Sequence, residues 1–277
     1  MEIGIFIIPA TLAVLLLELI AGAHRGIYSR NDYATLILCI AVTRAVTRPL
    51  FAVATALLLS SCFPADRGAL AAFPVLPSFL LILFACEFSF YWVHRWAHEA
   101  KGKPGRDWLW KLHRTHHAGK YMNVLVTLRI HPLWTLFVPT TWILGAAVYF
   151  GQELAATLTI LTIYGWNLIT HAHFRWDDAI RRSRRFGRLF RAIETVLVSP
   201  GIHHTHHGYG RDGASFRNYA VTFSFLDRIF GTLHIPEGRP ANYGLPGPTP
   251  PWFEEVFFPV FGWTRGRRAA KDRQPGI

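Results

Sequence analysis

Five long apolar runs are the feature that most constrains how this chain can fold. The runs are Ile3 to Ala23, Tyr33 to Ser60, Ala71 to Val93, Leu133 to Phe150 and Leu154 to Thr170. A helix needs about 20 residues to cross a bilayer, and hydrophobic residues make up 51% of the chain. Because a segment in lipid must satisfy its own backbone hydrogen bonds, the sequence predicts an all-α integral membrane protein with four to five transmembrane helices.

The distribution of basic residues indicates how the chain is oriented. The formal net charge is +12, and arginines and lysines are dense in residues 95–129 and 175–191, after the third and fifth runs. The loops at the other ends of these runs, residues 61–70 and 151–153, contain Arg67 as their only basic residue. By the positive-inside rule the dense segments face the cytoplasm, which leaves the N-terminus outside. We interpret the charge as a topology signal and an attraction to anionic lipid, with no role in binding nucleic acid.

The first run is expected to remain in the protein as a helix. It has no basic segment before it, and it contains Glu18, whereas a cleaved signal peptide begins with a positively charged region. Residues 1–70 are therefore predicted to form N-terminal transmembrane helices.

Most of the fourteen histidines lie in three clusters with helical spacing. The clusters are His94 with His98, His113 with His116 and His117, and His203 with His206 and His207. Residues three and four apart share one helix face, and neutral imidazole is the commonest nitrogen ligand of zinc, iron and copper. The first cluster directly follows the third apolar run, the second lies in the basic segment 95–129, and the third follows the basic segment 175–191. The sequence therefore predicts a helical, histidine-rich cap on the cytoplasmic side that holds a pair of metal ions.

The chemistry of this site is narrowed by which residue types are present. Structural zinc sites usually contain cysteines, but Cys39, Cys62 and Cys86 form no C-x-x-C pair. An all-histidine set beside apolar helices favours redox chemistry with O2 on a lipophilic substrate. Two alternatives stay open. A zinc-dependent membrane hydrolase would need a carboxylate near the metals, for which Glu99 is the immediate candidate, and a metal-binding or transport protein would need polar residues along the spans.

The arrangement of motifs resembles the fatty acid hydroxylase/sterol desaturase superfamily of membrane di-iron oxygenases. The resemblance rests on the following segments: His94-Arg95 with His98, Lys111 to His117, Arg129 to Pro132, Ser199-Pro200 with the box ending at His207, Asn218-Tyr219, and Leu226 to Thr232. Ala220 and Leu226 depart from the family pattern by conservative packing changes. The similarity covers about residues 75 to 245, so we expect a catalytic domain over 71–245 and a basic C-terminal tail over 246–277.

The resemblance implies a di-iron centre, O2 as oxidant, and electrons from an external reductase or carrier protein. It implies hydroxylation, or alternatively desaturation, of a C–H bond in a fatty acyl lipid, a sterol-like or hopanoid polycycle, or a carotenoid. The implied ligands are His94, His98, His113, His116, His117, His131, His171, His203, His206 and His207. Among these, His131 either ligates a metal or orients a ligand.

The remaining histidines are not expected to bind metal. His24 and His234 are expected to be structural, His173 to line the site, and His204 to be exposed. Asp227 has two open interpretations: it hydrogen-bonds a ligand imidazole, or it caps the turn of residues 226–232.

Overall fold

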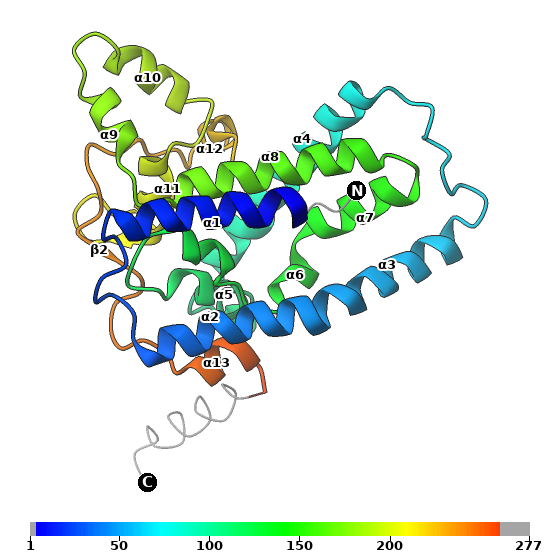
Figure 1. Cartoon of the computed structure of the whole chain (residues 1–277), viewed down its shortest axis with the longest axis horizontal. Coiled ribbons are helices and arrows are strands. Elements are labelled where there is room, and N and C mark those ends of the chain that lie inside the picture. Colours follow the sequence, from blue (N-terminus) through cyan, green and yellow to red (C-terminus); the bar gives the residue numbers. More distant parts are fainter. Residues whose placement is uncertain (1–3, 261–277) are drawn as a thin grey trace.

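Long helices dominate the computed structural model, which describes residues 4–260 (Figure 1). They are α1 (Gly4–Ile20), α2 (Arg30–Val42), which continues through the π-helical turn η1 (Thr43–Thr47) into α3 (Arg48–Cys62), α4 (Val75–Glu99) and α8 (Glu153–His171). The helices α4 and α1 both pack on α8. Two helical stretches, Arg30–Cys62 and Val75–Glu99, are long and apolar enough to cross a membrane, and α1 is a shorter apolar helix.

The fourth apolar run differs from the single helix that its length predicts. It forms α6 (Trp134–Phe137) and α7 (Pro139–Tyr149), separated by Val138 in an extended conformation. Proline lacks the N–H that a continuous helix needs and disfavours a helical residue before it. Eleven residues extend only about 16 Å, which is less than the roughly 30 Å of a bilayer core. The two pieces together still return the chain to the end of the molecule where α4 begins.

The turn between α7 and α8 depends on a glycine. Gly151 has a φ of +91°, and a Cβ there would lie 2.9 Å from the Cβ of Ala71. Backbone hydrogen bonds from Gly68 to Tyr149 and from Leu70 to Phe150 tie this turn to the connection between α3 and α4. Tight contact between two turns at this end leaves no room for a side chain.

Short elements gather at the opposite end, where α1, α4 and α8 finish (Figure 1). They are α5 (Asp107–His117), η2 (Val124–Leu128), α9 (Trp176–Arg181), α10 (Gly187–Glu194), α11 (Pro200–His207), α12 (Ser224–Ile229), α13 (Trp252–Phe257), and the antiparallel strands β1 (Gly208–Tyr209) and β2 (Asn242–Tyr243). We call these elements the cap. The helix α13 packs on α2 and α5, so part of the expected C-terminal tail belongs to the cap, and positions 261–277 lie outside the described residues.

A buried arginine joins the cap to α2. Arg129 is fully buried; it donates to the carbonyl of Thr115 at 2.9 Å, to Asp32 at 2.9 Å and to Glu255. These partners lie on α5, α2 and α13. A guanidinium can hold such diverging acceptors because its five N–H donors are fixed in one plane.

A buried glutamate joins the cap to α1. Glu18 accepts hydrogen bonds from the backbone N–H of Val124 at 3.1 Å and of His173 at 2.7 Å, and contacts His24 Nε2 at 2.9 Å. It therefore fixes the end of α1 to the segments that follow α5 and α8. Glu18 lies where α1 meets the cap, and this position explains why a carboxylate occurs inside an apolar run.

We expect Arg129→Ala to lower the free energy of unfolding by about 3–5 kcal/mol, because the substitution leaves buried carboxylates without their partner. The measurement is denaturant or thermal unfolding of the purified protein in detergent. Arg106→Ala is the control, since Arg106 is exposed and forms no ion pair within residues 4–260. Equal stability of the two variants would contradict the structural role of Arg129.

Candidate metal centre

Nine histidines form two adjoining groups in the interior of the cap. The first histidine group contains His94, His98, His113, His117 and His206, and the second histidine group contains His116, His171, His203 and His207. Within each group the candidate donor atoms all lie within 4.8 Å of one another. All nine side chains are buried except that of His116, which is half-buried.

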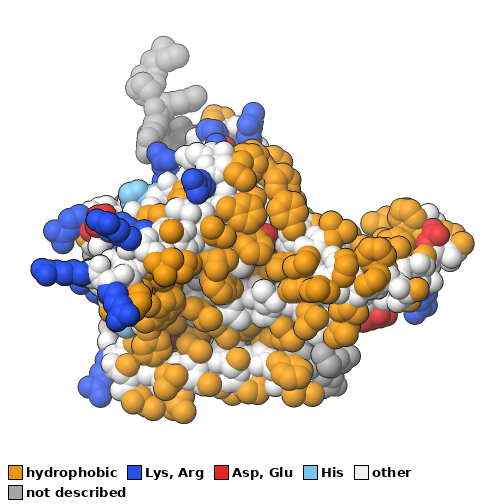
Figure 2. All heavy atoms as spheres, turned by 90° about the horizontal axis from the view of Figure 1, so that it is seen from above, with side chains coloured by type: hydrophobic (Ala, Val, Ile, Leu, Met, Phe, Trp, Pro, Cys, Tyr) orange, Lys and Arg blue, Asp and Glu red, His pale blue; other side chains and the backbone are white. Residues whose placement is uncertain are grey.

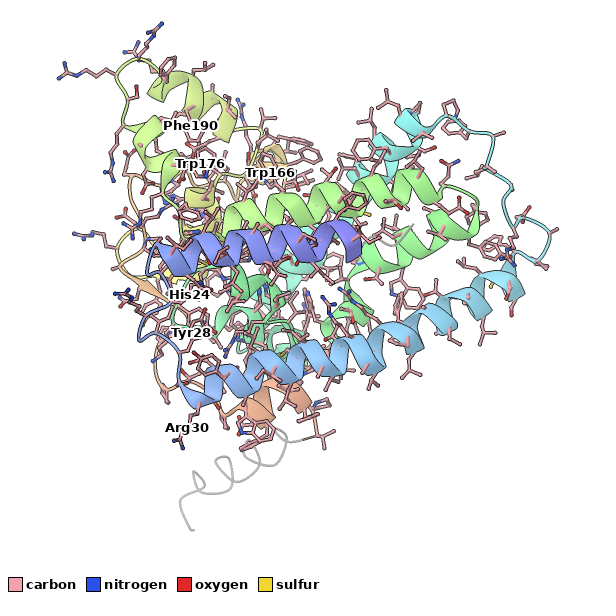
Figure 3. The ribbon with its side chains drawn as sticks, viewed as in Figure 1. His24, Tyr28, Arg30, Trp166, Trp176 and Phe190 are labelled. Atoms are coloured by element: carbon pink, nitrogen blue, oxygen red, sulfur yellow. The ribbon has the colours of Figure 1, made fainter. Side chains whose placement is uncertain are left out.

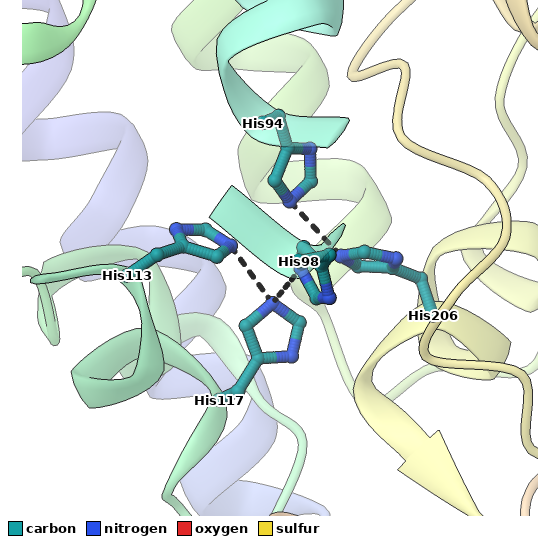
Figure 4. Close-up of side chains that lie close together, drawn as sticks. All are labelled: His94, His98, His113, His117 and His206. Carbon is teal, nitrogen blue, oxygen red and sulfur yellow. Dashed lines mark hydrogen bonds between the residues drawn. The ribbon is translucent and has the colours of Figure 1, made fainter. Parts of the chain in front are cut away.

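Four helices supply these side chains, and two of the helices serve both groups. The end of α4 contributes to the first group and the end of α8 to the second. In α5, His113 and His117 belong to the first group while His116 belongs to the second, and α11 divides its box in a similar way. Figure 4 shows the first group, with side chains from α4, α5 and α11 pointing toward a common centre. Stacking of His117 on His207, with ring centroids 4.3 Å apart, joins the two groups.

More ring nitrogens meet in the first group than hydrogen bonds between them can pair. His117 Nε2 lies 3.2 Å from His98 Nε2 and 3.0 Å from His113 Nε2 (Figure 4). A ring nitrogen either carries a proton or offers one lone pair, so one of these two contacts lacks an ordinary hydrogen bond. Nitrogens on neighbouring positions of one metal ion, each about 2.1 Å from it, would be about 3 Å apart. The donor set therefore fits a metal ion.

The second histidine group shows the same crowding. His171 Nε2 lies 3.3 Å from His116 Nε2 and 3.0 Å from His203 Nε2. His207 Nε2 is buried and has no hydrogen-bond partner among residues 4–260. A buried polar nitrogen without a partner is costly, and a metal ion would satisfy it.

Backbone carbonyls fix the orientation of four rings. The Nδ1 contacts are His94 to Tyr219 O at 2.6 Å, His116 to Val126 O at 3.1 Å, His171 to Asn167 O at 2.9 Å, and His206 to Arg217 O at 2.7 Å. A carbonyl accepts only from a protonated Nδ1, so each of these neutral rings keeps its Nε2 lone pair free and directed into its group.

Burial keeps the cap imidazoles neutral. Desolvation lowers the pKa of His116 to about 4 and that of His206 to about 3. Burial also lowers the pKa of His117 and His203 well below the ordinary value, and the neighbouring imidazoles contribute to this shift. A charged form is disfavoured where water is excluded, so the nitrogen lone pairs are available at neutral pH.

Of the two interpretations of Asp227, the structure supports the one in which its carboxylate caps the turn. It accepts hydrogen bonds from the N–H groups of Tyr219 at 2.7 Å and Ala220 at 2.9 Å and from the hydroxyl of Thr232 at 2.7 Å. It therefore holds the backbone loop and has no direct contact with an imidazole. Because the carbonyl of Tyr219 is the partner of His94, Asp227 supports that ring indirectly.

A buried ionic network positions the start of α11, and sequence reasoning did not identify it. Asp177 accepts from the N–H of Gly201 at 2.6 Å, and Ser199, the N-cap of α11, donates to Glu194 at 2.6 Å. Arg181 joins Asp177 and Glu194. Two features of the sequence could have indicated this network. Asp177 and Arg181 are four residues apart, on one helix face, and a Ser-Pro pair begins α11.

His131 is the one implied ligand that the structure does not bring into either group. Its Nδ1 accepts the N–H of Leu133 at 3.1 Å, while its Nε2 is buried and has no hydrogen-bond partner within the described part of the chain. Burial lowers the pKa of His131 to about 4, so it is a neutral residue at the start of the fourth apolar run.

The other four histidines also lie outside the two groups. His24 contacts Glu18, and His173 Nδ1 lies 3.4 Å from the carbonyl of Met122. The side chain of His234 is exposed. The expectation that His204 is exposed is wrong: it is buried, and its Nδ1 lies 3.1 Å from the hydroxyl of Tyr243, because α11 is enclosed on all sides within the cap.

Comparison with known proteins gives a family and several distant relatives. The family model described as fatty acid hydroxylase matches residues 79–232. The human alkylglycerol monooxygenase is 29% identical over 167 residues, which are 58% of this chain and 32% of the relative. The Arabidopsis thaliana methylsterol monooxygenase 2-1 is 30% identical over 196 residues, which are 63% of this chain and 65% of the relative.

A bacterial relative is similarly distant. The ornithine lipid hydroxylase of Rhizobium tropici is 27% identical over 169 residues, covering 59% of this chain and 43% of the relative. The chain thus spans between about a third and just under two thirds of the length of these three relatives. No solved structure matches the chain.

We expect each histidine group to bind one metal ion. His98→Ala in the first group and His203→Ala in the second should each reduce the bound metal from two ions per chain to one, as measured by elemental analysis of purified protein. His173→Gln, an exposed histidine outside both groups, should retain both ions. Full metal content in both alanine variants, with unchanged gel-filtration profiles, would contradict the two-site arrangement.

Proposed function

Since this chain belongs to the fatty acid hydroxylase family, we propose that it is an integral membrane oxygenase that hydroxylates a C–H bond of a lipid. The oxidant is O2, and the electrons come from an external reductase or carrier protein. The observation that carries the proposal is the pair of adjoining, buried imidazole groups within the matched residues 79–232.

The nine histidines of the two groups would hold two iron ions. Bound there, the ions would supply O2 activation and the oxidising power that C–H hydroxylation needs. Among residues 4–260, neither group includes a carboxylate. Glu99 accepts from Arg95 Nε at 2.8 Å, and so the carboxylate that a hydrolase would need is engaged elsewhere. This pairing favours the oxygenase over the zinc hydrolase.

The chain itself contributes geometry and exclusion of water. The carbonyls at the Nδ1 atoms hold the rings with Nε2 inward, and the buried loop supported by Asp227 keeps one of these carbonyls in place. Because α4 and α8 end in the histidine groups and pack on each other, the reacting position would lie beside apolar helices. A site of this kind binds and orients the apolar part of its substrate while excluding bulk water.

The substrate class follows from what the relatives have in common. Their names refer to an alkylglycerol, a methylsterol and an ornithine lipid, which differ in head group but share an apolar portion. We propose that this chain also acts on the apolar portion of a membrane lipid: a fatty acyl lipid, a sterol-like polycycle or a carotenoid. Desaturation at the same position is the variant reaction.

We propose that the cap faces the cytoplasm and the long helices cross the membrane. In this arrangement the chain would cross the membrane five times, through α1, α2–α3, α4, α6–α7 and α8. This number agrees with the dense basic segments beside the histidines, which stay on the cytoplasmic side. An electron donor would then reach the cap from the cytoplasm.

The direct test is lipid profiling of cells with and without the gene. Expression should produce a lipid that is heavier by one oxygen atom, and its formation by purified protein should require iron, O2 and a reductant. Product formation with zinc alone, or without O2, would exclude an oxygenase. A species lighter by two hydrogen atoms would identify desaturation.

Two ligand variants test the link between the histidine groups and turnover. We expect His206→Ala and His116→Ala each to lower turnover by more than about 100-fold, because the loss of even an outer hydrogen-bond partner of a ligand costs roughly 10–100-fold. Both variants should still be recovered in the membrane fraction. His234→Gln, at an exposed histidine, is the matched control and should keep full activity; full activity in either alanine variant would refute the assignment.

A further inference from the structure

The helix α10 projects from the rest of the cap (Figure 1), and its side chains form three distinct faces. One face is buried: Phe190 packs against Trp176 with ring centroids 5.9 Å apart, and Glu194 pairs with Arg181 at 2.5 Å (Figure 3). This face attaches α10 to α9 and, through Glu194 and Ser199, to the start of α11. The attachment is rigid, so the other two faces have fixed directions.

The second face of α10 is apolar and exposed. Phe186, Leu189, Ile193 and Val196 are spaced by three or four residues, and Leu189 is 62% exposed. Residues at this spacing lie along one side of a helix. Together with the exposed ring of Trp176 they form what we call the apolar stripe. Exposed apolar side chains gathered on one helix face in this way mark an interaction site.

The third face and the preceding loop are basic. Arg182, Arg184, Arg185 and Arg188 are all exposed, and no ion pair within the described residues 4–260 involves them. Arg185 lies over the ring of Phe186 at 5.1 Å, at the edge of the apolar stripe. Figure 2 shows lysine and arginine side chains gathered at one end of the molecule, directly beside a surface covered with hydrophobic side chains.

The connection to α8 places this element near the end of a proposed spanning helix. Only residues 172–175 separate the end of α8 from the start of α9, and four extended residues reach at most about 14 Å. The helix α9 therefore begins close to the membrane surface. A helix with arginine on one face and exposed apolar side chains such as Leu and Ile on another is typical of segments that lie in the plane of the interface.

We propose that α10 and residues 182–186 form a membrane-surface anchor for anionic phospholipid. The apolar stripe lies at the boundary between head groups and acyl chains, and the four arginines contact lipid phosphates of the cytoplasmic leaflet. The inference rests on the membrane location proposed above. Because Glu194 also holds the N-cap of α11, lipid contact at α10 stabilises the helix that carries His203, His206 and His207.

Spin-label accessibility tests the orientation of α10 in the full-length protein. In a Cys62→Ser background, which removes the exposed cysteine, a label is placed by Leu189→Cys on the apolar stripe, by Arg188→Cys on the basic face, or by Leu57→Cys on α3. The protein is reconstituted in vesicles of phosphatidylcholine and phosphatidylglycerol. We expect labels 189 and 57 to be accessible to O2 and shielded from a water-soluble nickel complex, and label 188 to show the reverse.

The outcomes separate this inference from the proposed function. If label 57 is accessible to the nickel complex, the membrane location itself is wrong. If label 57 is shielded but label 189 is accessible to nickel, or is shielded from both reagents as in a protein contact, only the anchor is refuted. Shielding from both reagents would identify a second copy of this chain as the occupant.

The arginines are tested separately. Replacing Arg182, Arg184 and Arg185 with Gln in the Leu189→Cys protein should lower the ratio of immersed to water-exposed label roughly fivefold per arginine. Vesicles of phosphatidylcholine alone should produce the same loss with the arginines intact. An unchanged ratio in both experiments would refute the recognition of anionic lipid.

Discussion

Nine imidazoles confined to one interior cannot satisfy each other, and this constraint shapes the rest of the cap. His117 and His171 each face two other ring nitrogens at 3.0–3.3 Å, although each nitrogen has one proton or one lone pair to offer. Protonation would not solve the problem, because burial lowers the pKa values of these rings. Such an arrangement is stable only if metal cations lie between the nitrogens, or if the surrounding structure holds the rings in place against the repulsion between their lone pairs.

The surrounding structure does hold them, through buried charges at the junctions between the long helices and the cap. Arg129 joins α2, α5 and α13, Glu18 joins α1 to the segments after α5 and α8, and Arg181 joins α9 to the start of α11. Every one of these charges has several partners, and that is the condition under which burying a charge is tolerated. Removing one partner would leave the others unpaired in the interior, and the displaced helix would carry its histidines with it.

The sequence predicts the individual helices and their histidine faces better than it predicts how the helices pack together. Spacing predicted the helices and the shared faces of the histidine boxes, because a helix brings residues three and four apart together without help from the fold. It could not show that α5 and α11 divide their boxes between two groups, since that depends on how four helices cross. The burial of His204 and the place of His131 outside both groups are likewise set by contacts distant in sequence, whereas the break at Val138 follows locally from Pro139. The family resemblance supplied the catalytic interpretation, and the match over residues 79–232 confirms the family.

Helix direction explains how a site without carboxylates can attract cations. His98, His117, His171 and His207 each lie in the last turn of their helix, so α4, α5, α8 and α11 all end at the histidine groups. The C-terminus of a helix carries about half a negative charge, and cations are favoured there. The effect fades within one turn, which is where these histidines are. Four converging helix C-termini therefore provide a negative potential that neutral imidazoles lack. This potential comes from buried backbone carbonyls whose direction is fixed by the helices. The position of the histidines at the ends of helices is thus as important for the proposed metal centre as the residue type.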